Sequence, residues 1–464
     1  MITDRRMPFV RPRTAAVACA AVLVVSASYL AAALDGGRLA VSPPSGPAAS
    51  IAALEPQAPP AGRSDLLMAR YDRAIRAWNA SLEASAANYI AATNLGTVYV
   101  GRARLTGDLG DYDRALAAAS RALQANKSYL PALQLHATIL FAVHDFVGAR
   151  EEARTILADA PDQLQAVATL GDASLELGDV AVARESYLAL DRQIPSPPVW
   201  SRLSHLAFVE GDLDRAIGLA QRAIDGSAEE PPSESTAFYH FQLGELYRSR
   251  GDEEAAMAAY ERALEDLPGY VPASAGLSRM YEAIGRRDDA IALLERATEQ
   301  IPQPEMVAAL GDLYALAGDA VAAEQAYRLV ERIGAVASAT GAVYNRQLVI
   351  FAADHDRGLA GAVALARAEL MVRKDVYGHD ALAWALFKSG DLTEAAIEAD
   401  AAQALGTRDP RIAYHAGMIA AAQGRTGDAR RLLTQAVAGA AALPPLQVPV
   451  AARALAALDG ASAP

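Results

Sequence analysis

The sequence holds one cysteine, few aromatic residues and none of the common catalytic motifs. Cys19 is the only cysteine among 464 residues, which excludes a disulfide within the chain and a metal site built from several cysteines. No His-Glu-x-x-His, phosphate-binding glycine loop or Gly-x-Ser-x-Gly occurs, and the seven histidines are dispersed. We therefore predict a protein that is not an enzyme and that has no catalytic residues, metal site or cofactor.

Basic residues are scarce relative to acidic ones. The chain has 42 Lys and Arg against 55 Asp and Glu, a net charge of −13. Nucleic-acid binding depends on a basic surface that neutralises phosphates, so we expect no nucleic-acid partner. We interpret the excess of negative charge as a contribution to solubility.

What the sequence does contain is a periodic series of small residues. They recur at intervals of 34, 34, 33, 40, 34, 33, 38, 34 and 34 residues, at Ala115, Ala149, Ala183, Ala216, Ala256, Ala290, Ala323, Gly361, Ala395 and Ala429. Gly-Asp pairs recur with them as predicted turns, at Gly110-Asp111, Gly178-Asp179, Gly211-Asp212, Gly251-Asp252, Gly318-Asp319 and Gly390-Asp391. A nearly constant interval of this size indicates an array of structural repeats.

Residues 237–268 illustrate what each interval contains. Leu243 and Gly244 share one face of a predicted first helix, and Ala256 and Tyr260 share one face of a second. The small residues allow the two helix backbones to approach closely, and Pro268 ends the unit because a helix normally stops before proline. The unit resembles the tetratricopeptide repeat, a helix–turn–helix of 34 residues.

This resemblance implies an all-α fold, a right-handed α-solenoid of about ten repeats that covers residues 88–442. We predict a capping helix at 63–87, because a terminal repeat has no neighbour on one side. A C-terminal cap and tail are expected at 443–464. The longer intervals predict possible breaks in the array near 226–235 and 332–341.

The N-terminal segment predicts a membrane location. Residues 1–13 are basic, and residues 14–34 hold no charge and would span about 30 Å as a helix, the thickness of a hydrocarbon core. The positive-inside rule then places the repeats outside the cytoplasm. We favour an uncleaved, bacterial-type anchor because the segment is longer than a usual signal core. The alternative is a secretory signal cleaved near Ala31-Ala32-Ala33, which would release the protein. Residues 35–62, rich in Pro and Ala, predict an extended linker.

The resemblance also implies where a partner binds. In the family, the first helices of the repeats line a concave surface that commonly binds an extended or helical peptide. Carried over to this sequence, the most aromatic and polar positions of that surface lie in the fourth to sixth repeats, at Arg202, His205, Phe208, Phe238, Phe241, Gln242, Glu245, Arg248, Arg279 and Glu282. For Phe238 and Phe241 the alternative is packing against the preceding repeat.

We therefore expect a non-catalytic scaffold that binds an unidentified protein or peptide partner on its concave face, at the membrane. One alternative is an assembly factor for an envelope or secretion complex. Another is an extracytoplasmic solute- or glycan-binding protein, whose groove aromatics would stack on sugars.

Overall fold

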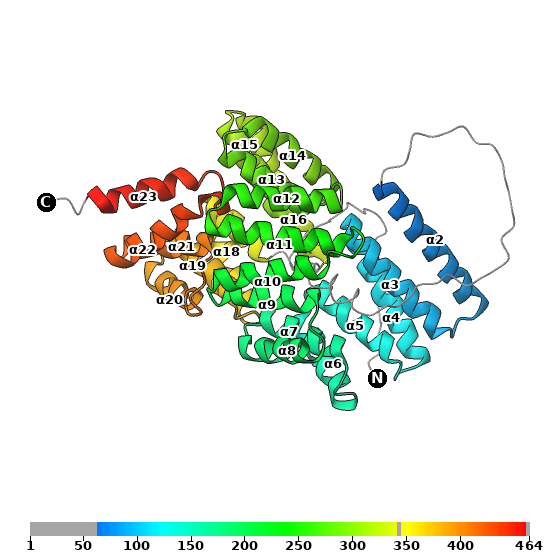
Figure 1. Cartoon of the computed structure of the whole chain (residues 1–464). Helices are drawn as coiled ribbons and strands as arrows, with labels where there is room; N and C mark the ends of the chain where they lie inside the picture. Colours follow the sequence, from blue (N-terminus) through cyan, green and yellow to red (C-terminus); the bar gives the residue numbers. More distant parts are fainter. Residues whose placement is uncertain (1–62, 341–344, 461–464) are drawn as a thin grey trace, which may run out of the picture.

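The computed structural model describes residues 63–340 and 345–460, and these ranges fold entirely into helices without a strand (Figure 1). The predicted anchor at 14–34 and the linker at 35–62 lie outside the described residues. Within the described residues, no helix combines the length and apolar character needed to cross a membrane. The helices are α2 (Arg63–Ala84), α3 (Tyr89–Thr106), α4 (Leu109–Ala125), α5 (Leu130–Ala142), α6 (Phe146–Asp159), α7 (Leu164–Glu176), α8 (Val180–Gln193), α9 (Pro197–Val209), α10 (Leu213–Gly226), α11 (Glu234–Arg250), α12 (Glu253–Asp266), α13 (Val271–Ala283), α14 (Arg287–Gln300), α15 (Pro304–Leu316), α16 (Ala320–Thr340), α17 (Asn345–Asp354), α18 (Leu359–Leu370), α19 (Val376–Ser389), α20 (Leu392–Ala402), α21 (Pro410–Ala422), α22 (Thr426–Ala438), the 3-10 helix η1 (Ala440–Ala442) and α23 (Val448–Gly460).

Ten pairs of antiparallel helices follow one another, from α3 and α4 to α21 and α22. Each pair packs on the next, so the array is an all-α solenoid, as the sequence predicts. α2 and α23 lie at its two ends in Figure 1 and occupy the positions predicted for the caps.

Where a Gly-Asp pair forms the turn within a repeat, each of its two residues has a separate task. Gly251 ends α11 in the left-handed region at φ 82°, which favours glycine. Asp252 then caps α12 and accepts a hydrogen bond of 3.2 Å from the backbone N–H of Ala255. In the first repeat, however, the turn is Gly107-Asp108 and not the predicted Gly110-Asp111. Asp111 already lies within α4, so the prediction was shifted by three residues.

The small residues sit where the two helices of a repeat touch. Ala256 is fully buried, and a Cβ at Gly244 would lie 2.6 Å from a ring carbon of Tyr260, so only glycine fits there. The eighth repeat corrects the predicted series, since Gly361 is exposed and the next residue, Ala362, is buried instead.

The lengths of some elements break the regular repeat. α3 has 18 residues where most first helices have 13. α10 and α11 share one buried cluster on both sides of the acidic loop between them, so packing continues across the first predicted break. α16 has 21 residues and continues through residues 332–340, where the sequence predicted the second possible break.

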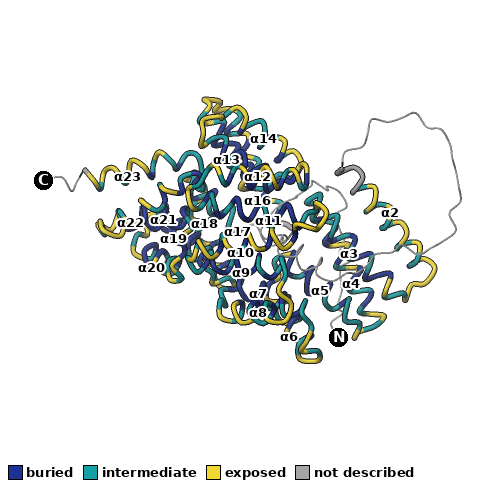
Figure 2. The backbone as a smooth tube through the Cα atoms, viewed as in Figure 1, coloured by how far each residue is buried: buried dark blue, intermediate teal, exposed yellow. Residues whose placement is uncertain are grey.

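The array curls until distant repeats touch (Figures 1 and 2). The turns within the third, fourth and fifth repeats lie against the loops that follow α18, α20 and α22. A Cβ added at Gly178, Gly211 or Gly251 would lie 2.3, 2.0 and 2.1 Å from the carbonyl oxygens of Lys374, Gly406 and Ala438, respectively. We call this line of contacts the seam. From one contact of the seam to the next, both partners move one repeat further along the chain.

A charged cluster stabilises one end of the seam. Arg373, which follows α18, pairs with Glu176 at the end of α7. Glu369 and Asp375 lie on the same side and pair with Arg346 at 3.2 and 2.8 Å. Burial raises the pKa of Glu176 although the positive charge of Arg373 opposes this.

Candidate functional site: a charged cavity on the concave face

First helices of five repeats enclose a cavity of about 100 Å³. Its charged lining residues come from α13 to α21 in order. They are Arg279 of α13, Glu305 and Asp312 of α15, Arg346 and Asp354 of α17, Asp380 of α19 and Arg411 of α21. Residues 442–445, which follow α22, form another part of the wall. The cavity therefore collects groups from repeats that are far apart in the sequence.

Glu305 is the central acid of this cavity. It accepts a hydrogen bond of 2.8 Å from Arg279 and lies 3.9 Å from the guanidinium of Arg411. Burial alone would raise the pKa of Glu305, but the two arginines outweigh it and lower the pKa. Glu305 is therefore ionised and holds two arginines from α13 and α21 near one another.

Arg411 differs from the other arginines of the cavity. Within the described residues its guanidinium donates no hydrogen bond, and the 3.9 Å contact with Glu305 is its nearest ion pair. The pKa of Arg411 is raised because the acids around it outweigh its burial. Its five N–H donors remain able to bind a polar group of a partner.

A second set of groups surrounds Asp354. Its Oδ1 accepts hydrogen bonds from the indole of Trp384, at 2.7 Å, and from the amide of Gln447. Burial raises the pKa of Asp354. Nearby, His415 contacts both oxygens of Asp380 at 2.9 and 3.0 Å and stacks on Trp384. These contacts tie α17, α19, α21 and the segment after α22 together.

Asp312 of α15 links the seventh repeat to the residue that follows α17. Its Oδ1 accepts the Tyr327 hydroxyl and contacts His355 Nε2, both at 2.9 Å. Burial alone would lower the pKa of His355, but the contact with Asp312 outweighs it and raises the pKa.

Three of the ten sequence-predicted site residues approach this cavity. Arg279 lines it directly, and Glu245 and Arg248 form an ion pair on the neighbouring helix α11. Burial alone would raise the pKa of Glu245, but the charges of Arg248 and Arg279 lower it. A line of alternating charges thus runs along the concave face from α11 through α13 to α15.

Four other predicted residues lie deeper in the fourth and fifth repeats. Phe238 and Phe241 belong to a buried cluster of α11 to α13, and both are less than 10% exposed. Arg202 is 1% exposed and forms hydrogen bonds of 2.9 Å to Asp172 of α7. Gln242 is also buried and bonds to Ser201. These side chains connect neighbouring repeats.

The last three lie apart from one another. Glu282 pairs with Arg287 at the turn of the sixth repeat, and Phe208 packs partly buried between α9 and α10. His205 faces a second cavity, of about 450 Å³, that lies along the seam between α7, α9 and the loop before α19. Burial lowers the pKa of His205 to about 4. The partner-binding role of the ten residues stays a prediction.

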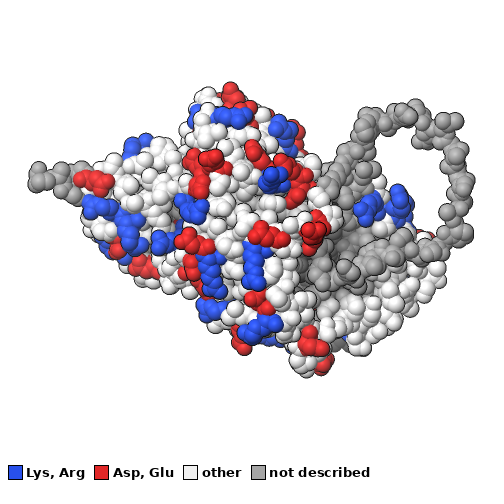
Figure 3. Space-filling model, in the orientation of Figure 1, with Lys and Arg blue, Asp and Glu red and all other residues white. Residues whose placement is uncertain are grey.

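Sequence reasoning missed Glu305, Asp354, Asp380 and Arg411. A signal existed for two of them, since Glu305 and Arg411 each follow the proline that begins a first helix. Nothing local indicates that α15 and α21 face each other, because this depends on how far the array curls. On the outer surface, acidic and basic side chains alternate over the face shown in Figure 3.

Comparisons with known proteins agree with this architecture. Three family models described as tetratricopeptide repeat match the chain, at residues 134–198 and 381–445, 197–268, and 247–313. No curated protein has a sequence that matches this chain.

Similar solved structures include a tetratricopeptide repeat protein from Parabacteroides merdae, with 17% identity over 52% of this chain and 94% of that one, at a TM-score of 0.39. An IFIT1 monomeric mutant with Gppp-AAAA has 16% identity over 68% of this chain and 71% of that one, at a TM-score of 0.47. MamA has 25% identity over 35% of this chain and 93% of that one, at a TM-score of 0.29.

Proposed function

Because the chain belongs to the tetratricopeptide repeat family, we propose that it is a non-catalytic scaffold that binds a protein or peptide partner through the charged cavity of its concave face. Proteins of this family bind protein partners and are generally not enzymes. The observation that carries the proposal is the convergence of first helices from five repeats on one cavity. A partner held there would contact several repeats at once.

Arg411 is the group that we assign to the partner. Its guanidinium is surrounded by acids but makes no hydrogen bond to them, so a polar oxygen of a peptide can bind it without breaking an existing hydrogen bond. Arg279 is the second contact, since one hydrogen bond to Glu305 leaves further donors on its guanidinium. Their acidic neighbours favour a partner that also offers hydrogen-bond donors.

The test is cross-linking in cells followed by capture of the full-length chain. Arg411→Ala should reduce recovery of the partner while helical circular dichroism stays unchanged. Arg367→Ala is the matched control, because Arg367 lies half-exposed on the second helix α18 and pairs with Glu394. Equal recovery with all three proteins would move the interface away from the cavity, and capture of polysaccharide alone would favour the glycan-binding alternative.

We also propose that residues 14–34 hold the repeats at the outer face of a membrane, where they would assemble an envelope or secretion complex. The proposal rests on the uncharged segment and the arginines before it. Protease added to intact cells should digest the repeats, and the full chain should fractionate with membranes. Recovery of a shortened chain from the medium would instead support a cleaved signal.

A further inference from the structure

The segment that connects α22 to α23 lies across the groove between distant repeats. Residues 439–447, which we call the strap, include η1 and two consecutive prolines. η1 contacts α11, α13 and α21. Leu443 has φ −82° and ψ 154°, an extended conformation, and Pro444 and Pro445 cannot continue a helix ladder. The strap therefore leaves the α-helical array as a short segment in which the extended Leu443 stands between η1 and a turn, where the N–H of Gln447 donates to the carbonyl of Pro444.

Two apolar side chains of the strap enter different halves of the protein. Ala441 belongs to the buried cluster of α11 to α13, the same cluster as Phe238 and Phe241. Two positions later, Leu443 is 3% exposed and belongs to the cluster of the C-terminal repeats. The strap thus covers part of the surface where the sequence placed the partner, and it does so with apolar contacts.

One polar contact anchors the other end of the strap. The amide of Gln447 donates to Asp354 in the charged cavity. The amide oxygen of Gln447 is buried and has no hydrogen-bond partner among the described residues. A buried oxygen without a hydrogen-bond partner is unfavourable, so Gln447 stabilises the strap less than a fully hydrogen-bonded amide would.

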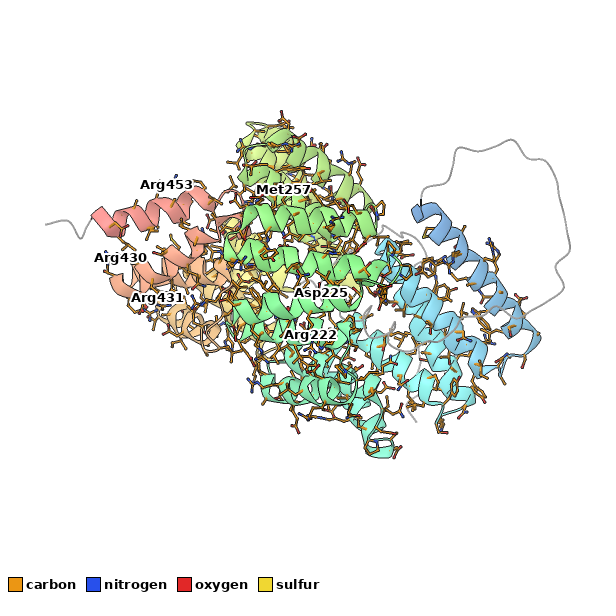
Figure 4. The ribbon with its side chains drawn as sticks, viewed as in Figure 1. Arg222, Asp225, Met257, Arg430, Arg431 and Arg453 are labelled. Atoms are coloured by element: carbon orange, nitrogen blue, oxygen red, sulfur yellow. The ribbon has the colours of Figure 1, made fainter. Side chains whose placement is uncertain are left out.

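In the strap and α23 four side chains are buried, at Ala441, Leu443, Gln447 and Ala451. α23 is mostly exposed or half-exposed in Figure 2 and packs mainly on α22. Its far end is held by Arg430 of α22, which pairs with Asp459 at 3.0 Å on the surface. Figure 4 places Arg430, Arg431 and Arg453 at the same end of the molecule. Terminal elements with few buried contacts open at low free energy.

We propose that the strap is a resident ligand of the groove, and that the partner is a short, proline-containing apolar peptide of the same kind that displaces it. This inference rests on the scaffold function proposed above and names the chemistry of its partner. The partner would place a small or branched apolar side chain at the site of Ala441, another at the site of Leu443, and an amide near Asp354. Because the strap competes within the chain, it lowers the apparent affinity for such a partner.

The experiment uses a fluorescent peptide with the sequence of residues 440–447 and the full-length protein. In Leu443→Asp the strap loses its contact with the C-terminal cluster, so the peptide should bind about ten-fold tighter than to the parent. Leu446→Asp is the matched control, since Leu446 lies in the same strap but in neither buried cluster. It should bind the peptide as the parent does.

A second variant keeps the test decisive if Leu443→Asp loses helical circular dichroism. Gln447→Ala removes only the amide contact with Asp354, and it should tighten peptide binding about three-fold. A folded variant that binds the peptide no better than the parent overturns the inference. If a partner is still captured through Arg411 in that case, the scaffold function stands and only the role of the strap is lost.

Discussion

Many turns of this solenoid hold a glycine in the left-handed region, and these glycines form two groups that differ in their surroundings. Gly178, Gly211 and Gly251 lie at the seam, where a Cβ would collide with a carbonyl oxygen of a distant loop. Gly285, Gly318, Gly390 and Gly424 have similar positive φ angles, yet a Cβ at any of them would meet no atom within 4 Å. The second group needs glycine for the turn alone, and the first group also needs it for contact between distant repeats.

The comparison shows that the curl of the array makes a second interface from turns that have the same left-handed glycine. It brings the C-terminal repeats against the turns of the third to fifth repeats. It also closes the charged cavity, because α15 and α21 meet only when the array curls this far.

The largest effect is expected from Gly211→Ala. A left-handed conformation costs a non-glycine residue about 1–2 kcal/mol, and here the Cβ would also lie 2.0 Å from the Gly406 oxygen. We expect a loss of more than about 3 kcal/mol in urea unfolding, with separation of the seam seen as a larger radius of gyration. In Gly318→Ala only the turn is strained, so the loss should be about 1–2 kcal/mol without expansion. Equal losses of stability for Gly211→Ala and Gly318→Ala would contradict the distinction between turns at the seam and turns away from it.

A smaller effect should follow from overpacking inside a repeat. Ala256 is fully buried between α11 and α12, so Ala256→Leu should cost about 1–3 kcal/mol. Because the contact lies within one repeat, the radius of gyration should stay that of the parent. An unchanged melting temperature would show that the assignment of Ala256 to the helix contact is wrong.

The charged end of the seam should contribute less. Arg373→Ala leaves Glu176 without its partner, and we expect a loss of about 1–2 kcal/mol because both side chains keep some contact with solvent. Arg262→Ala breaks an exposed pair with Glu265 and should cost about 0–0.5 kcal/mol. Double-mutant cycles measure the coupling energy of each pair. Equal values would show that Arg373 and Glu176 stabilise the protein no more than an exposed surface pair does.

The smallest effect concerns pH. Burial at the seam lowers the pKa of His205 to about 4, so unfolding allows the imidazole to bind a proton at higher pH. Stability from this group is present above pH about 6.5 and is lost as the pH falls toward 4, by about 1–2 kcal/mol between pH 7 and 5. His205→Gln should flatten that part of the pH profile. A profile unchanged by the substitution would mean that His205 stays solvated.

The sequence predicts the repeat far better than the arrangement of repeats. Small residues and Gly-Asp pairs are local signals, and they place the helices and most turns correctly. The errors, at Gly110-Asp111 and Gly361, fall in repeats whose helices depart from the usual lengths. The seam has no local signal, because curvature accumulates from small rotations between repeats.

The sequence predicted only some residues of the cavity, because it does not show how far the array curls. Glu245, Arg248 and Arg279 lie on consecutive first helices, so periodicity alone brings them to one face. Glu305 is one repeat further along the same face, and Arg411 comes from a repeat that only the curl brings near. Phe238 and Phe241 were predicted from their position on that face, but the strap of the same chain adds to their burial.

The most direct test of the closed array is the distance between the fourth and ninth repeats. Spin labels at Asp214→Cys and Arg408→Cys, in a Cys19→Ser background, flank the contact between Gly211 and Gly406. The closed array predicts one narrow population of short distances in electron double resonance. A broad population at long distances, as an open solenoid would give, would contradict the seam and the cavity that depends on it.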